Sequence, residues 1–169
     1  MGQLLPTVEV MAKETISRRI NLGDELPTAY RQLLAVTQSV GKAAADAGLD
    51  PLLIELVKIR ASQLNGCAFC LDMHSRAARK LGETERRLYV LAAWHETDLF
   101  DERERAALAL TEAITRLADL RDVPDEVYAQ AAKVFSEHEL AIVAWLANVI
   151  NSLNRIGVFS RLPLPKDPQ

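Results

Sequence analysis

The chain has 169 residues, 49% of them hydrophobic, which is enough for one folded domain and excludes a wholly disordered protein. Its 20 Lys and Arg against 23 Asp and Glu leave a net charge of −3, so it lacks the basic field of a nucleic-acid-binding protein. No continuous apolar run reaches about 18 residues, and the first residues lack the apolar core of a secretory signal. We therefore expect a cytoplasmic protein that binds neither nucleic acid nor membrane.

Helix caps divide the chain into helical segments. Asp50 followed by Pro51 marks one helix start, and two capping boxes mark others, Asp101 with Glu104 and Ser136 with Glu139. The predicted helices cover residues 27–47, 51–65, 67–81, 84–94, 101–118, 124–135 and 136–153. This pattern predicts an all-α bundle of six to seven helices, oligomeric, over residues 25–155. Residues 1–24 are expected to form an N-terminal arm without a clear helix, and 156–169 a Pro-rich tail.

The segment from Glu55 to His74 contains the candidate reactive residues. If residues 67–74 are helical, Cys67, Cys70 and His74 lie at about 0°, −60° and −20° around the helix, on one narrow face. Cys70 and His74 are one turn apart, and Cys67 and Cys70 have the spacing at which a disulfide closes within one turn. In a reducing compartment, such a pair is typical of catalytic, redox-active or metal-binding cysteines.

Three features favour a reactive thiolate. The cysteines lie at a predicted helix N-terminus, His74 can take up a proton, and Lys58 and Arg60 add positive charge upstream. Together they are expected to lower a cysteine pKa from about 8.5 to roughly 5–7. A turn at residues 65–66 would bring the Glu55 carboxylate back to this face, where it would fix the histidine tautomer.

The spacing favours Cys70 as the attacking thiolate, because only Cys70 has the histidine one turn away. Thioredoxin-type motifs give a rival argument for Cys67, since there the first cysteine is the more exposed. We predict that Cys70 attacks a peroxide oxygen, and that Cys67 then resolves the sulfenic acid to a disulfide. A dithiol reductant would reset the pair. No flavin, nicotinamide or phosphate-binding motif is present in the sequence, so no cofactor is expected.

The pattern Glu55, eleven residues, Cys67-Ala68-Phe69-Cys70, three residues, His74 resembles the AhpD-like alkylhydroperoxidases of the carboxymuconolactone decarboxylase family. The string LVKIRASQLNGCAFCLDMHSRAARKLGETERRLYVLAAW resembles the core domain of that family. The resemblance implies an all-α fold, a homohexamer or homotrimer, and peroxidase activity supported by a thiol-bearing partner protein. It also implies that Cys70 is peroxidatic, that Cys67 resolves, and that Glu55 and His74 relay protons.

The sequence departs from the family pattern at one position. Better-studied members carry a second histidine directly before the second cysteine, where this chain has Phe69. The proton relay is therefore expected to be shorter, and Phe69 is expected to form an apolar mouth suited to organic peroxides. The decarboxylase branch of the family lacks the cysteine pair, so the reaction on carboxymuconolactone is a poor inference for this chain.

Two alternatives stay open at this stage. In the first, the chain is a non-enzymatic assembly module that senses redox state or binds zinc, with His95 or His138 as a fourth ligand beside Cys67, Cys70 and His74. In the second, the pair acts as a general disulfide reductase. Taken singly, His74 could also be an ordinary histidine whose ring is hydrogen-bonded to a backbone carbonyl. Glu55 taken singly could be a solvent-facing helix residue.

Overall fold

The computed structural model describes residues 19–165. Of the predicted arm 1–24 and the predicted tail 156–169, residues 1–18 and 166–169 lie outside this range. The arm was expected to lack a clear helix, but its residues 22–24 belong to a short helical turn. Within it the chain is all-α. The elements are α2 (Leu22–Glu25), α3 (Pro27–Asp46), α4 (Pro51–Asn65), α5 (Ala68–Lys80), α6 (Glu85–Val90), the 3-10 helix η1 (Leu91–Glu96), α7 (Glu102–Thr115), α8 (Leu117–Leu120), α9 (Asp125–Val134) and α10 (Glu137–Ser160).

The predicted start signals are confirmed. Asp50 accepts a hydrogen bond from Leu52 N at the start of α4, and both predicted capping boxes are formed, at α7 and α10. Each box satisfies backbone N–H groups that would otherwise lack a partner at the helix start. Short-range sequence signals therefore set where these helices begin.

The count of six to seven helices is too low for residues 19–165, which contain nine α-helices and one 3-10 helix. α2 and α8 are single turns, too short for an apolar stripe to be recognised in the sequence. The helix predicted for 84–94 divides into α6 and η1, and the one predicted for 101–118 is interrupted at Arg116.

The last helix is longer than predicted. It continues past Leu153 to Ser160, so residues 156–160 are helical and do not belong to an extended tail. Gly157 and Ser160 are buried, and α10 ends at Arg161, whose φ of 48° is left-handed. Tertiary packing therefore extends the helix beyond its regular apolar repeat.

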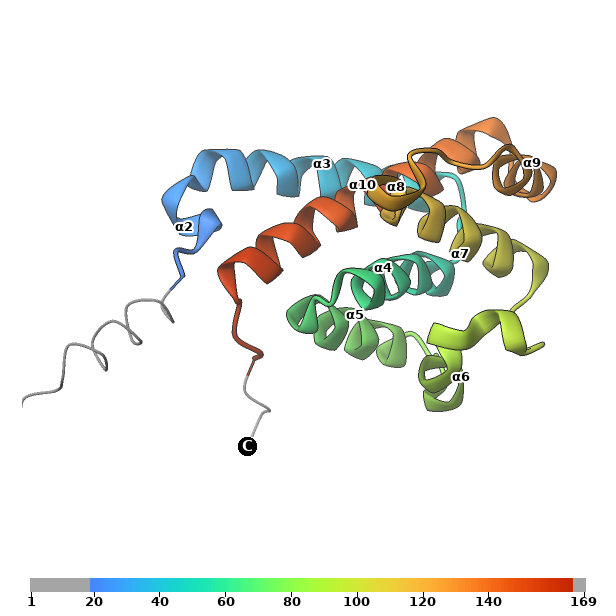
Figure 1. Ribbon diagram of the computed structural model, residues 1–169, viewed down its shortest axis with the longest axis horizontal. Coiled ribbons are helices and arrows are strands. Elements are labelled where there is room, and N and C mark those ends of the chain that lie inside the picture. The colour runs from blue at the N-terminus through green and yellow to red at the C-terminus, as the bar shows by residue number, and fades with distance from the viewer. Residues whose placement is uncertain (1–18, 166–169) are drawn as a thin grey trace, which may run out of the picture.

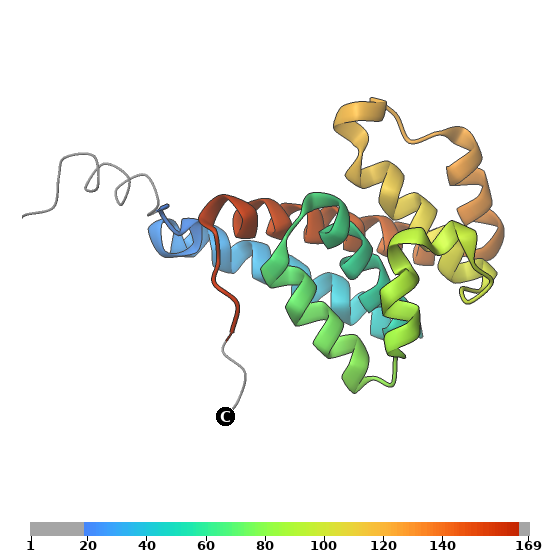
Figure 2. The same ribbon diagram turned by 60° about the horizontal axis from the view of Figure 1, so that its bottom comes forward.

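Helices α4 and α10 form the centre of the bundle. α10 packs against α3, α4 and α7, and α4 packs against α5, α7 and α10. Figure 1 shows α3 alongside α10, with the α4–α5 pair beneath them. In Figures 1 and 2 the C-terminal end of α10 lies near the turn between α4 and α5. That junction holds the two cysteines.

The core has two parts. The larger lies among α3, α4, α7, α9 and α10 and includes Leu53, Val57, Leu110 and Val143, and the smaller joins α4 to η1 and α7 through Leu56, Leu91 and Leu108. By length and mean hydropathy (1.3), α10 is long and apolar enough to cross a membrane. No such helix was expected from the sequence, because polar residues interrupt every apolar run. Half of its apolar window is buried inside the protein, as in the core helix of a bundle.

Candidate active site

The turn between α4 and α5 positions both cysteines. Gly66 ends α4 with φ 66° and ψ 30°, a left-handed conformation that glycine adopts without a steric penalty. Cys67 follows as the N-cap of α5, and its Sγ accepts a hydrogen bond from Cys70 N at 3.4 Å. Cys67 therefore lies just outside the helix. The angle predicted for it around a helix that includes residue 67 does not apply, whereas Cys70 and His74 are helical as predicted.

Cys67 and Cys70 form a disulfide, with their Cα atoms 5.4 Å apart. This is the pairing that the i, i+3 spacing predicts. Both residues are buried, with exposed fractions of 1% and 3%. Cys70 lies in the first turn of α5, where the helix dipole favours negative charge on sulfur.

A carboxylate on α4 joins the histidine of α5. Glu55 Oε2 lies 2.8 Å from His74 Nδ1, and Glu55 Oε1 accepts a hydrogen bond from Lys58 Nζ at 2.7 Å. Glu55 is buried, so the solvent-facing alternative is excluded for it. The turn at Gly66 thus brings Glu55 to His74 as predicted.

This contact fixes the ionisation of Glu55. Burial raises its pKa, but the hydrogen bonds and charges of His74 and Lys58 outweigh that effect, and the net pKa lies below the usual value of 4.5. An ionised carboxylate only accepts hydrogen bonds, so the bonded Nδ1 of His74 carries the hydrogen. The Nε2 of a neutral His74 is then left to accept a proton.

The two upstream cations do not act as predicted. Lys58 is paired with Glu55, and Arg60 Nε donates to Glu112 Oε1 at 2.8 Å. Glu112 Oε1 also accepts from Trp94 Nε1 at 2.7 Å. Both charges are therefore neutralised locally by a carboxylate, and neither is left unpaired beside the cysteines.

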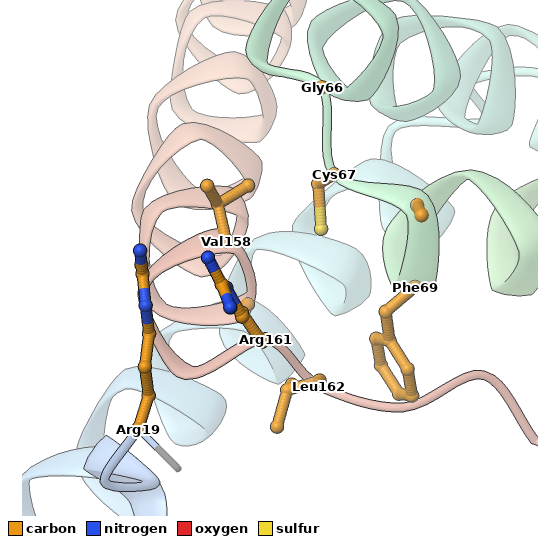
Figure 3. A pocket seen from close by; sticks show the side chains of 9 residues that line it. Arg19, Gly66, Cys67, Phe69, Val158, Arg161 and Leu162 are labelled. Atoms are coloured by element: carbon orange, nitrogen blue, oxygen red, sulfur yellow. The ribbon is translucent and has the colours of Figure 1, made fainter. Parts of the chain in front are cut away.

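Two cavities reach the site, and their linings share no residue. The first has a volume of about 450 Å³ and meets the disulfide at Cys67, with Phe69 on its wall (Figure 3). The second is smaller, about 180 Å³, mostly apolar, and reaches Lys58 and His74 from between α3 and α10. Cys67 is thus approached from one cavity and His74 from another.

Helix α10 approaches the disulfide most closely at Gly157. A Cβ at this position would lie 3.0 Å from Cys67 Sγ and 3.7 Å from Cys70 Sγ. Only a residue without a side chain leaves ordinary contact distances here. Gly157 was not singled out from the sequence, although a glycine inside a helix is a signal of close packing.

A buried polar network fixes α10 against α4 below the turn. Asn65 Nδ2 donates to Asn151 Oδ1 at 2.8 Å and to Asn154 Oδ1 at 3.0 Å, and Asn154 Nδ2 donates to Ser62 Oγ at 2.9 Å. Ser62 belongs to this network, and its hydroxyl donates onward to Lys58 O. The asparagines of α10 were not singled out from the sequence, because their partners lie about ninety residues away.

The residues of the zinc alternative are not brought together. His95 stacks on Trp94 with ring centroids 3.6 Å apart, and His138 lines a groove between α3 and α10. Within residues 19–165, no three His, Cys, Asp or Glu side chains form a group able to hold a metal ion. The fourth ligand that this alternative requires is therefore not supplied by either histidine.

The model of the Carboxymuconolactone decarboxylase family matches residues 27–113. The chain belongs to this family. Similar proteins include the uncharacterized protein YdfG of Bacillus subtilis (strain 168), which is 39% identical over 143 residues, 85% of this chain and 94% of YdfG. The uncharacterized protein YnjA of Escherichia coli (strain K12) is 39% identical over 66 residues, 38% of this chain and 36% of YnjA.

Solved structures agree with the family assignment. ATU0492 of Agrobacterium tumefaciens, a protein of unknown function named as a candidate antioxidant defence protein AhpD, superposes with a TM-score of 0.81 at 33% identity. The match covers 89% of this chain and all of that structure, so this carboxymuconolactone decarboxylase family member has an AhpD-like fold. The debrominase Bmp8 shares the fold alone, at 19% identity and a TM-score of 0.69 over 84% of this chain and 74% of Bmp8.

Proposed function

We propose that this protein is a thiol-dependent peroxidase that reduces organic hydroperoxides or hydrogen peroxide through a Cys67/Cys70 dithiol–disulfide cycle. The observation that carries the proposal is the disulfide-forming pair at the start of α5, with the Glu55–His74 contact one turn further along. The AhpD-like fold is consistent with it.

In the proposed oxidative half-reaction, the Cys70 thiolate attacks the outer peroxide oxygen. A sulfur–oxygen bond forms, the oxygen–oxygen bond breaks, and the leaving alkoxide takes a proton that His74 relays, giving an alcohol. Cys67 then attacks the Cys70 sulfenic acid, forming the disulfide and releasing water. The balance is two thiols and one hydroperoxide giving one disulfide, one alcohol and one water.

Each residue has a distinct proposed role. His74 moves the proton, and Glu55 holds its tautomer through the 2.8 Å contact. The first turn of α5 favours a thiolate at Cys70. A dithiol restores the pair by thiol–disulfide exchange.

The first experiment exposes the reduced protein to tert-butyl hydroperoxide, counts the remaining thiols and measures the intact mass. The expected result is the loss of both thiols with the loss of two hydrogens. Cys70→Ser should abolish peroxide consumption, whereas Cys67→Ser should give one equivalent of sulfenic acid without turnover. Full activity in Cys70→Ser would refute the assignment of the attacking thiol.

The alternatives are separated in the same preparation. Thiols that react only after a chelator is added would support a metal site. Reduction of a disulfide substrate, without any consumption of peroxide, would support a general disulfide reductase. A change of oligomeric state on oxidation, with negligible turnover, would support a redox-sensing assembly.

Assembly as a homohexamer or homotrimer is part of the proposal. Its support is an apolar groove of about 410 Å³ between α3 and α10, which includes Val36 and Trp145, the latter 56% exposed. Light scattering on the eluate of a sizing column measures the mass directly. A monomeric mass at micromolar concentration would refute this part alone.

A further inference from the structure

The cavity beside Cys67 carries a charge pattern that the proton relay does not use. Its lining contains Arg19, Arg161 and Val158 on one side and Phe69 on the other, with Leu162 between them (Figure 3). No acidic side chain is among the described residues that line it. In a chain of net charge −3, this is a local cationic site with apolar walls.

The two arginines are held by the C-terminal end of α10. Arg19 Nη1 donates to Phe159 O at 3.2 Å, which leaves its other donors for a ligand. Arg161 ends α10 in a left-handed conformation that usually selects glycine or asparagine. Its guanidinium makes no hydrogen bond or ion pair with residues 19–165, unlike those of Arg60 and Arg87.

The cavity also determines which sulfur a ligand meets. Cys67 is part of its lining and Cys70 is not. A thiolate that enters the cavity therefore reaches Cys67 Sγ, and Cys70 becomes the leaving group, one turn from His74. Attack on Cys67 of the disulfide belongs to the reductive half-reaction, because peroxide reacts with the reduced pair and not with the disulfide.

We propose that this cavity binds the reducing thiol as a small anionic molecule, an aliphatic thiol with a carboxylate, whose charge pairs with Arg19 and Arg161. This inference rests on the proposed dithiol–disulfide cycle. Phe69, Val158 and Leu162 contact the aliphatic part, and a carboxylate accepts the paired N–H groups of a guanidinium. The volume of about 450 Å³ is that of a small-molecule site.

The proposed step is balanced. The entering thiolate forms a bond to Cys67 Sγ, the disulfide bond breaks, and its electron pair goes to Cys70 Sγ, which takes a proton through His74. A second thiol, on the same molecule or another, attacks the sulfur of the bound reductant and releases Cys67. Two thiols are oxidised to one disulfide, and the protein disulfide is reduced to two thiols.

The test begins with protein oxidised by diamide, so that no peroxide chemistry is required. Single-turnover reduction is measured with 3-mercaptopropionate, 2-mercaptoethanol and cysteamine, whose second groups are negative, neutral and positive. The variant is Arg19→Gln/Arg161→Asn, in which asparagine retains the left-handed cap. The matched control is Arg86→Gln/Arg116→Gln, which removes two exposed arginines outside the cavity lining.

For each thiol, the ratio of wild-type to variant rate constants cancels the intrinsic reactivity of that thiol. The expected ratio is about tenfold larger for 3-mercaptopropionate than for 2-mercaptoethanol, and smallest for cysteamine. The difference should collapse at about 1 M salt, where screening acts over about 3 Å. The control pair should leave all three rate constants unchanged.

Equal ratios for the three thiols in a variant that unfolds at the wild-type urea concentration would overturn the proposal. The arginines would then serve only the end of α10. Failure of all three thiols to reduce the wild-type disulfide would overturn it as well. The separate tert-butyl hydroperoxide titration reports on the peroxidase proposal, so the two can fail independently.

Discussion

Replacing Gly157 with alanine tests how closely α10 approaches the disulfide. The added Cβ would lie 3.0 Å from Cys67 Sγ, whereas ordinary contact begins at 3.4 Å. An alanine inside a helix normally stabilises by about 1 kcal/mol over glycine. Extra volume in a packed site costs about 1–3 kcal/mol, so the net change is expected to be zero to destabilising.

Gly41 provides the matched control. It lies inside α3, with ordinary helical φ, and nothing lies within 4 Å of a Cβ built on it. Gly41→Ala should therefore raise the free energy of unfolding by about 1 kcal/mol through helix propensity alone. The two substitutions have the same chemistry and differ only in what the methyl group meets.

The assay is urea unfolding of the oxidised proteins at pH 7, followed by far-UV circular dichroism. Gly157→Ala should be about 1–3 kcal/mol less stable than Gly41→Ala, the cost of overpacking alone. It should also slow the attack of thiols at Cys67, because the methyl group presses on that sulfur. Equal stabilisation by both substitutions would refute the close approach of α10 to Cys67.

Three further predictions each concern a single residue. Glu55→Gln should slow single-turnover disulfide formation by about 10–100-fold at pH 7, because it weakens the orientation of His74. The rate constants of wild type and variant should converge as the pH falls from 4.5 through the lowered pKa of Glu55. A variant rate constant within twofold of wild type at pH 7 would contradict this. Glu139→Gln keeps the capping oxygen but loses the negative charge that faces Arg103. Urea titrations should therefore show a free energy of unfolding about 0.5 kcal/mol lower than that of wild type at pH 7. This difference should fade between pH 4.5 and the Glu139 pKa of about 2, where the wild-type carboxylate takes up its proton. Gly66→Ala should cost about 1–2 kcal/mol in the same assay through its positive φ, although no atom lies within 4 Å of the added Cβ, and an unchanged midpoint would contradict this.

Capping signals predicted the starts of α4, α7 and α10 because they act within a few residues. Ser136 with Glu139 and Asp101 with Glu104 form the same boxes in the structure that they indicate in the sequence. Helix ends were less predictable. α10 extends to Ser160 because residues such as Gly157 pack against the distant Cys67.

The candidate site likewise combines contacts that the sequence predicted with one that it did not. Cys67, Cys70 and His74 are close in the sequence, so helical spacing alone indicated that they act together, and the disulfide has the predicted pairing. The Glu55–His74 contact crosses only one turn, at Gly66, and was within reach of the same reasoning. Lys58 was expected to add free positive charge, but its pairing with Glu55 depends on side-chain geometry that spacing does not specify.

The sequence by itself determined the helical class, the cysteine pair and the pairing of Glu55 with His74, because each depends on contacts within about twenty residues or across one turn. Tertiary structure alone decided which sulfur faces a cavity and what surrounds it. Arg19 and Arg161 are separated by most of the chain, and they meet beside Cys67 only because α10 ends at the α4–α5 turn. The local sequence pattern places the cysteine pair, whereas its access and electrostatic surroundings depend on which distant helix ends the fold brings against it.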